Sequence, residues 1–180
     1  MFVQTQKTPN PDSLKFLPEK KVSLIGPLEI LKKENTNNSL LRNILSIEGI
    51  TGIFLSENFL SINKTKERNW EDLKHIIISF INEYYSDGNE CVINHDQNKE
   101  SSKDLKEVEK EIVKILETKV RPAVARDGGD IKFKEFKDGI VKVQLHGSCS
   151  GCPSSTMTLQ QGVQNLICHY IPEVKKVEAI

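Results

Sequence analysis

The chain has 180 residues, which is enough for one ordinary domain or two small ones. Hydrophobic residues make up 37% and charged residues 28%, a globular balance that argues against extensive disorder. The 25 basic and 25 acidic side chains cancel, and no stretch approaches the roughly 20 consecutive apolar residues of a membrane-spanning helix. We therefore expect neither nucleic acid nor a membrane among the partners.

The use of cysteine indicates the compartment. Four cysteines at uneven spacing do not form the disulfide framework of a small secreted domain. Residues 1–10 carry neither a secretory apolar core nor an Arg-rich amphipathic pattern. We expect a reducing compartment, a bacterial cytoplasm with the mitochondrial matrix as the alternative, and there a close cysteine pair indicates metal or redox chemistry.

Alternating apolar residues predict a sheet in the N-terminal half. Leu14 and Phe16 flank Lys15 as in a short strand that follows a run of turn-forming residues. Residues 50–55 and 59–62 predict two further strands joined by a tight hairpin.

Two helices are expected to cover this sheet. Apolar residues at helical spacing over residues 40–45 follow Ser39, a plausible cap, and Gly49 is expected to end that helix. A longer apolar stripe over residues 70–84 follows Asn69, which is well placed as the second cap. The N-terminal half therefore predicts a small αβ sandwich.

A polar segment divides the chain. Residues 87–102 are expected to form a linker between an N-terminal domain, residues 1–86, and a C-terminal domain, residues 103–180. In the second domain the apolar residues between positions 105 and 120 form a helical stripe. Pro122 is expected to end that helix or to restrict it near its end.

The rest of the C-terminal domain predicts a hairpin followed by a helix. Residues 127–130, Asp-Gly-Gly-Asp, are expected to form a turn without a catalytic role. Two antiparallel strands are expected on either side of a turn at residues 138–139, then a helix over residues 153–170 and a short extended segment over residues 174–180. The sequence thus predicts an α+β fold of two small domains, each a small sheet packed against helices.

A cysteine pair, Cys149 and Cys152, lies between the last predicted strand of the hairpin and the following helix. Two intervening residues let one turn aim both sulfurs at one metal, and Gly147 and Gly151 let the backbone come close. Pro153 suits the first helical position, which places both sulfurs near the positive end of the helix dipole. We therefore expect an exposed loop in which a lowered pKa favours the thiolates.

Two thiolates are too few for a structural zinc or a cubane cluster, which commonly take four protein ligands. Cys168 lies sixteen residues beyond Cys152 on the same predicted helix, about 24 Å away, and cannot reach. Cys91 lies in the predicted linker and approaches only by flexible excursion. The simplest completion is a second copy of the chain that donates its own pair across a twofold axis, which leaves a shared metal centre at the surface and exchangeable.

Two other interpretations of the pair stay open. A thiol-disulfide oxidoreductase would use Cys149 as nucleophile and Cys152 as resolving thiol, and a structural zinc protein would use the motif only to clamp a dimer. Thioredoxin-type motifs follow a strand in a parallel βαβ context, whereas this pair follows a predicted antiparallel hairpin. That difference weighs against the redox interpretation.

Several segments together carry a family signature. In the C-terminal domain these are Arg121-Pro122, Asp127-Gly128-Gly129-Asp130, the stretch from Gly147 through Cys149 and Cys152 to Ser155, and Tyr170-Ile171-Pro172-Glu173-Val174. In the N-terminal domain they are Gln4-Thr5, residues 8–11, residues 13–16, residues 49–54 and Trp70. In this order and spacing the chain resembles, over nearly its whole length, the Nfu proteins, whose C-terminal domain is the NifU-like C-terminal domain.

The resemblance implies a [4Fe-4S] cluster bound between two protomers through Cys149 and Cys152 of each, a homodimer when loaded. It further implies delivery of the cluster to apo iron-sulfur proteins and supply by an upstream assembly machinery, with the N-terminal domain serving partner recognition or positioning. Transfer is expected to proceed by ligand exchange, in which cysteines of the target replace the pair stepwise. We therefore expect a carrier and not an enzyme.

Other polar residues receive no ligand role at this point. His146 is interpreted as a solvated histidine at a strand end, and Cys91 and Cys168 as thiols without a ligand role. Arg121 and Arg126 either contact a partner in cluster delivery or act as cations at a helix end.

Overall fold

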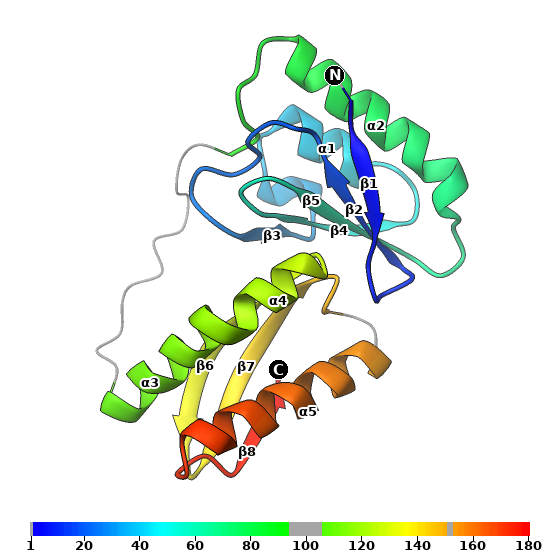
Figure 1. Ribbon diagram of the computed structural model, residues 1–180. Coiled ribbons are helices and arrows are strands. Elements are labelled where there is room, and N and C mark those ends of the chain that lie inside the picture. Colours follow the sequence, from blue (N-terminus) through cyan, green and yellow to red (C-terminus); the bar gives the residue numbers. More distant parts are fainter. Residues whose placement is uncertain (1, 94–105, 151–152) are drawn as a thin grey trace. The chain divides into compact units, whose positions relative to one another are not determined.

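The computed structural model describes residues 2–93, 106–150 and 153–180, with backbone only for residues 153–155. The chain forms two compact units, Met1–Asn98 and Lys99–Ile180, which are described separately (Figure 1). Each combines a small sheet with helices, which confirms the predicted α+β class. Within the described residues, no helix combines the length and apolar character needed to cross a bilayer.

The N-terminal unit is built on a five-stranded sheet with the order β1-β2-β5-β4-β3, in which every neighbouring pair is antiparallel. The strands are β1 (Gln4–Lys7), β2 (Ser13–Leu17), β3 (Leu28–Ile30), β4 (Ile50–Leu55) and β5 (Leu60–Lys64). The three predicted strands are confirmed as β2, β4 and β5. The edge strands β1 and β3 were not predicted, because β1 has no apolar alternation and β3 has only three residues.

Helices α1 (Ser39–Leu45) and α2 (Trp70–Ser86) cover this sheet, and a short 3₁₀ turn, η1 (Lys33–Asn35), precedes them. Buried side chains of both helices form one cluster with those of the strands, among them Phe16, Ile44, Ile62 and Ile77. Burial of these apolar side chains is the main favourable contribution to the unit's stability.

The cap of α1 differs from the prediction. Asn38, not Ser39, is the N-cap, because its Oδ1 accepts a hydrogen bond from the backbone N–H of Leu41 at 3.2 Å. Helix α1 ends at Leu45, before Gly49, whose positive φ of 92° places it in the turn that leads to β4. Asn69 does occupy the cap position of α2, without a side-chain capping bond.

Asn38 also holds the segment that follows α2. Its Nδ2 donates to Tyr84 Oη and to the backbone oxygen of Val92, both at 2.9 Å. Val92 is buried, and Ile93 forms a parallel bridge with Ser23. The segment predicted as a linker therefore begins with residues that pack on the N-terminal unit, while the exact domain boundaries stay a prediction.

Replacing Asn38 with alanine should destabilise the N-terminal unit by about 1–3 kcal/mol, because the cap and two further hydrogen bonds are lost together. Urea unfolding followed by the fluorescence of Trp70, the single tryptophan of the chain, would measure the change. Asn37→Ala, at the exposed neighbouring position, is the matched control and should leave the midpoint unchanged. Equal midpoints for both variants would contradict this role of Asn38.

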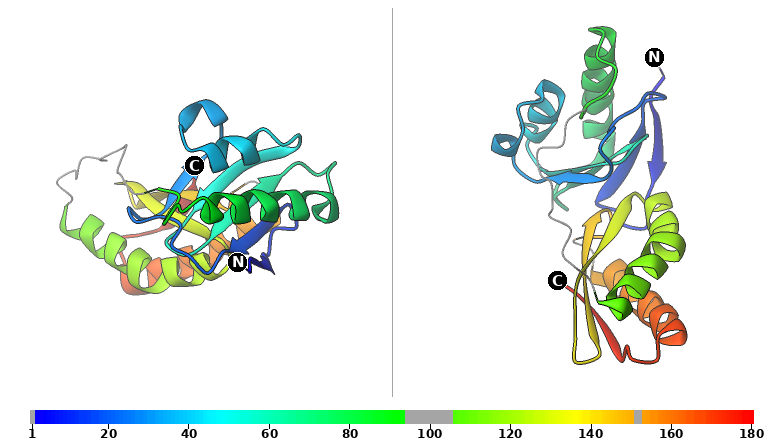
Figure 2. Two further views of the ribbon diagram at one scale, coloured as in Figure 1. Left: turned by 90° about the horizontal axis from the view of Figure 1, so that it is seen from above. Right: turned by 90° about the vertical axis from the view of Figure 1, so that its left-hand side faces the viewer.

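The C-terminal unit has a three-stranded sheet of order β6-β7-β8, covered on one face by helices (Figure 2, right). Its elements are α3 (Glu107–Ile115), η2 (Leu116–Val120), α4 (Arg121–Arg126), β6 (Gly129–Lys137), β7 (Ile140–Gly147), α5 (Pro153–Tyr170) and β8 (Lys176–Ala179). The predicted hairpin is confirmed, and its turn residues Asp138 and Gly139 both have positive φ, 54° and 80°. The predicted helix over residues 153–170 is confirmed as α5.

Pro122 restricts the preceding helix and does not end it. Residues 116–120 form a widened π-type turn, in which the N–H of Arg121 bonds to the backbone oxygen of Leu116. Proline lacks an N–H and its ring clashes with the carbonyl four residues earlier in a regular α-helix. The wider turn accommodates that ring, so the helical rod continues through α4 to Arg126.

The strand that leads to the cysteine pair has two neighbours. β7 pairs antiparallel with β6 and parallel with β8, and α5 makes the crossover between β7 and β8. The pair therefore follows a strand of a βαβ unit. The predicted contrast with the thioredoxin-type context is wrong, because the short C-terminal strand, expected only as extended chain, returns to pair with β7.

Candidate metal centre

Cys149 lies directly after β7, in a turn closed by local hydrogen bonds. The backbone N–H and the hydroxyl of Ser150 both donate to the backbone oxygen of Gly147, at 3.2 and 2.8 Å. Gly147 has a positive φ of 67°, which favours glycine. The hydroxyl of Thr156, in the first turns of α5, donates to the backbone oxygen of Cys149 at 3.1 Å. Cys152 lies outside the described residues.

The Cys149 side chain is buried, contrary to the expected exposed loop. Only 7% of the residue is accessible, and it belongs to the core cluster of the C-terminal unit together with Val124, Leu145 and Val163. Sequence reasoning missed this because a position between a strand and a helix indicates a loop, while burial depends on what packs over that loop.

The segment that packs over the Cys149 turn connects α4 to β6. The backbone N–H of Ser148 donates to the oxygen of Gly128 at 3.2 Å, and the Ser148 hydroxyl donates to the oxygen of Asp127. The expected turn is present at Asp127 and Gly128, where Gly128 has a φ of 84°. Gly129 and Asp130, however, already belong to β6. Two chain segments far apart in sequence thus meet at the thiol.

Gly129 lies close to the thiol. A Cβ added at this position would lie 2.6 Å from Cys149 Sγ and 2.6 Å from the backbone oxygen of His146. The first atom is a side-chain sulfur, but the second is fixed in the β6–β7 ladder and cannot move cheaply. Only glycine therefore leaves room for the sulfur at this place.

Burial raises the pKa of the Cys149 thiol to about 11. A side-chain hydrogen bond between Cys149 and Ser148 opposes this shift, and the carboxylates of Asp127 and Asp130 add to it. The expectation of a thiolate favoured by the helix dipole is wrong for Cys149 in the empty protein, because the cost of removing a charged sulfur from water exceeds the favourable contributions.

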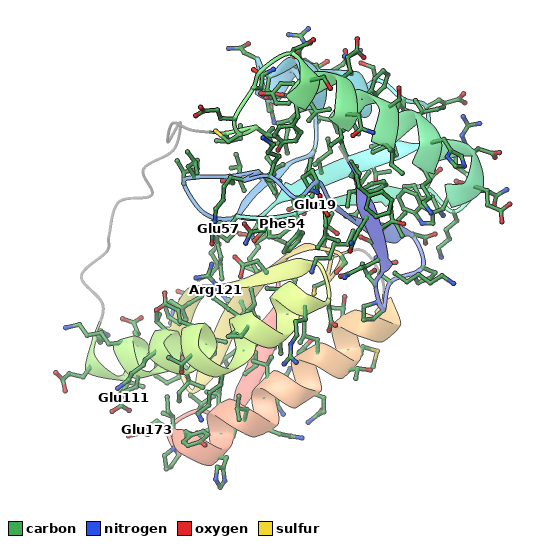
Figure 3. All side chains as sticks on the ribbon, turned by 45° about the horizontal axis from the view of Figure 1, so that its top comes forward. Glu19, Phe54, Glu57, Glu111, Arg121 and Glu173 are labelled. Carbon is green, nitrogen blue, oxygen red and sulfur yellow. The ribbon has the colours of Figure 1, made fainter. Side chains whose placement is uncertain are left out.

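Arg121 (labelled in Figure 3) forms a bidentate ion pair with Asp130 beside this turn. Arg121 Nε and Nη2 donate to the two carboxylate oxygens of Asp130 at 2.8 and 3.0 Å. The Asp130 side chain is only 4% exposed, and its hydrogen bonds raise the pKa of Arg121. The guanidinium of Arg121 is thus bound to Asp130 within the C-terminal unit.

The sequence did not predict this ion pair, because no local spacing links the start of one helix with the start of a strand.

The remaining candidates do not gather around Cys149. His146 is half-buried in β7, opposite Asp130, and is therefore not the solvated strand-end residue that was expected. Cys168 lies on α5 and packs at the edge of the core, while Cys91 belongs to the N-terminal unit. Among the described residues, no three His, Cys, Asp or Glu side chains are close enough to hold a metal ion together. The residues that the structure describes therefore do not form a metal site around Cys149 by themselves.

The high pKa of Cys149 predicts slow alkylation of the empty protein. With a pKa of about 11, roughly one thiol in a thousand is ionised at pH 8. We expect iodoacetamide, quantified at Cys149 by peptide mass spectrometry, to react at least about a hundredfold more slowly than in urea. The pH at which the rate is half-maximal should lie near 11 in the folded protein and near 9 in the unfolded chain. If the pH midpoint of alkylation in the folded protein lay at or below that of the unfolded chain, the raised pKa of Cys149 would be contradicted.

Replacing Gly129 with alanine should displace the thiol and destabilise the C-terminal unit by about 1–3 kcal/mol, because the new methyl group overlaps Cys149 Sγ and a fixed backbone oxygen. Differential scanning calorimetry would measure the change. Gly162→Ala on α5 is the matched control, since a Cβ there meets nothing within 4 Å and alanine favours the helix. A Gly129 variant as stable as the Gly162 variant would show that the contact is not tight.

The comparisons with known proteins identify the class. Residues 112–178 match the family described as NifU-like domain, and residues 3–88 match the one described as scaffold protein Nfu/NifU N terminal. The two matches cover most of both halves of the chain. The chain belongs to the Nfu family of NifU-like proteins, which confirms the resemblance seen in the sequence.

Curated relatives align over the full chain. The NFU1 iron-sulfur cluster scaffold homolog, mitochondrial, of Homo sapiens is 40% identical over 183 residues, which cover 100% of this chain and 72% of that protein. NifU-like protein 4, mitochondrial, of Arabidopsis thaliana is 39% identical over 185 residues, 99% of this chain. The chain spans 65% of that protein's length. A solution structure of a NifU-like protein from Saccharomyces cerevisiae is 27% identical, with a TM-score of 0.48, over 53% of this chain and 87% of that one.

Proposed function

We propose that this protein is an iron-sulfur cluster carrier. Two protomers hold one [4Fe-4S] cluster as cargo through Cys149 and Cys152 of each, and the dimer delivers it to apo iron-sulfur proteins. Membership of a scaffold family supports the class of function. The observation that carries the proposal is the ligand deficit of the sequence itself, since Cys149 and Cys152 are the single close pair among its four cysteines and a cubane commonly needs four ligands.

Loading requires a change at Cys149. The thiol is buried and its pKa is raised, whereas iron binds the thiolate. Iron binding therefore displaces a proton and draws the sulfur out from beneath the α4–β6 turn. Because protons and iron compete for the same sulfur, the loaded form loses stability as the pH falls.

Delivery needs no general base and no covalent change in a substrate. Cysteines of the recipient replace Cys149 and Cys152 on the iron atoms one at a time. A sulfur that has a stable buried position when empty assists this exchange, since the released Cys149 returns to its place beside Gly129. We therefore propose a carrier without an enzymatic reaction of its own.

The thiol-disulfide oxidoreductase remains the second candidate. The βαβ context of the pair no longer weighs against it. Its nucleophile, however, would be a buried thiol with a raised pKa, whereas reactive cysteines are exposed and have lowered pKa values. Burial of Cys149 hinders both roles, so the names of the curated relatives are what favours the carrier. A zinc clamp would use the same ligands, and metal analysis separates it.

The partners follow from the proposed role. Recipients are apo iron-sulfur proteins, and an upstream assembly machinery supplies the cluster. The names of the curated relatives favour the mitochondrial matrix, the second of the two compartments considered from the sequence. The N-terminal unit is proposed to recognise partners or to position the cysteine pair.

The double variant Cys149→Ser/Cys152→Ser should lose the cluster. After anaerobic reconstitution we expect about two iron and two acid-labile sulfide per chain in the unchanged protein, since a cluster of four iron atoms serves two chains. The double variant should retain less than about a tenth of this content because serine oxygen is a poor ligand for iron. Cys168→Ser is the matched control and should load normally, as Cys168 lies elsewhere on α5.

The same preparations distinguish the alternatives. Zinc without sulfide in the unchanged protein would indicate a clamp, and insulin reduction at catalytic rates would indicate an oxidoreductase. Retention of iron and sulfide by the double variant, or by a monomer of the unchanged chain, would contradict the proposal.

A further inference from the structure

The helix that follows the cysteine pair presents a surface without charge. The eighteen residues of α5 include no Asp, Glu, Lys or Arg. Its described exposed side, with Met157 exposed to 71%, consists of Met157, Thr158, Gln161, Gly162, Asn165, His169 and Tyr170. We call these residues the outer face of α5.

The lack of charge is specific to this helix. Charged residues make up 28% of the whole chain. On α2 the exposed positions include Glu71, Asp72 and Glu83, and on α3 they include Lys110 and Glu111. Protein interfaces are depleted of charged residues at their centre and enriched in methionine and aromatic residues. The outer face of α5 therefore has the composition of a contact surface, whereas the other long helices have that of solvated ones.

The position of the outer face on the helix indicates which molecule contacts it. Helix α5 begins at Pro153, the residue after the cysteine pair. At 1.5 Å per residue, Met157 lies about 6 Å and Gln161 about 12 Å along the helix from that point. A cluster shared by two copies brings the starts of their two α5 helices together. Among the exposed side chains of α5, those nearest to its start, Met157 and Thr158, are then the first available to contact the second copy.

The outer face is also shaped for helix packing. Met157, Gln161, Asn165 and His169 follow at steps of four and form one ridge along the helix. The amide of Gln161 donates to Asn165 Oδ1 at 2.9 Å, so the middle of the ridge is already ordered. Lys119 lies over the ring of Tyr170 at 5.2 Å, which places a cation near the end of the ridge that is remote from the cysteine pair.

We propose that the outer face of α5 is the contact surface between two copies of this chain in the cluster-bridged dimer, with Met157 and Gln161 facing the same region of the second copy. This inference rests on the proposed function. The contact is symmetric, so a charge introduced at these positions meets an identical charge across the twofold axis. Like charges juxtaposed in an interface are strongly unfavourable.

Two double variants test the contact, Met157→Glu/Gln161→Glu and Met157→Lys/Gln161→Lys. After anaerobic reconstitution, light scattering coupled to gel filtration measures the dimer, and iron and sulfide analysis measures the cluster. Each variant alone should form at least about tenfold less cluster-bound dimer than the unchanged protein. An equimolar mixture should recover it, because opposite charges then face each other. The anionic cluster would repel only the glutamate variant. A loss of dimer by the lysine variant as well therefore indicates repulsion between the two copies.

Ser79→Glu, at an exposed position of α2, is the control for added charge, and it should load and dimerise as the unchanged protein does. All variants should melt like the unchanged protein when empty, since both altered positions are exposed. Normal loading and dimerisation of both double variants, or failure of the mixture to recover, would overturn this inference alone. Failure of the unchanged protein to hold a cluster would overturn the proposed function with it.

Discussion

The ion pair between Arg121 and Asp130 sets the frame on which the cysteine turn depends. It joins the start of α4 to the start of β6, and Asp130 lies opposite His146 at the end of β7. Between these two anchored points the chain passes through Gly128 and Gly129, which contact Ser148 and Cys149. A buried carboxylate is tolerated only when it is paired with a cation. The charge-assisted hydrogen bonds of Arg121 therefore hold Asp130 in place. The ion pair thus joins the two ends of the segment that contacts Ser148 and Cys149.

Burial of Cys149 bears on two requirements of the proposed carrier: the thiol must be protected when no cluster is bound, and it must be available to iron when one is loaded. An empty protein with exposed thiolates would oxidise or capture unwanted metals, because thiolate character and exposure control both reactions. A protonated sulfur packed beside Gly129 avoids these reactions, and the cost is the proton that iron must displace. The Cys149 turn is held by hydrogen bonds of Ser148, Ser150 and Thr156, interactions of modest net strength that a cluster with strong iron–sulfur bonds can replace.

Local patterns predicted much of the fold, whereas the site depended on long-range packing. Alternation predicted β6 and β7, and Pro153 predicted the start of α5, because these signals act within a few neighbouring residues. The parallel pairing of β8 with β7, the Arg121–Asp130 pair and the burial of Cys149 each join segments that are distant in sequence. The prediction of a low thiol pKa failed for the same reason, since it counted the helix dipole and could not count desolvation.

Helix α5 links the core, the cysteine pair and the outer face in one rigid element. Its inner side buries Val163 and Ile167, and Gln160 and Gln164 bond to the backbone of Val177 in β8 at 2.6 and 3.0 Å. These bonds join the middle of the helix to the sheet. The outer face, by contrast, is polar and uncharged and offers little apolar area. A contact of this kind is weak by itself, and in the proposed dimer the iron–sulfur bonds would add the missing affinity. Under that proposal cluster binding and dimerisation are one event, so that removal of the cluster by a recipient would also separate the two copies.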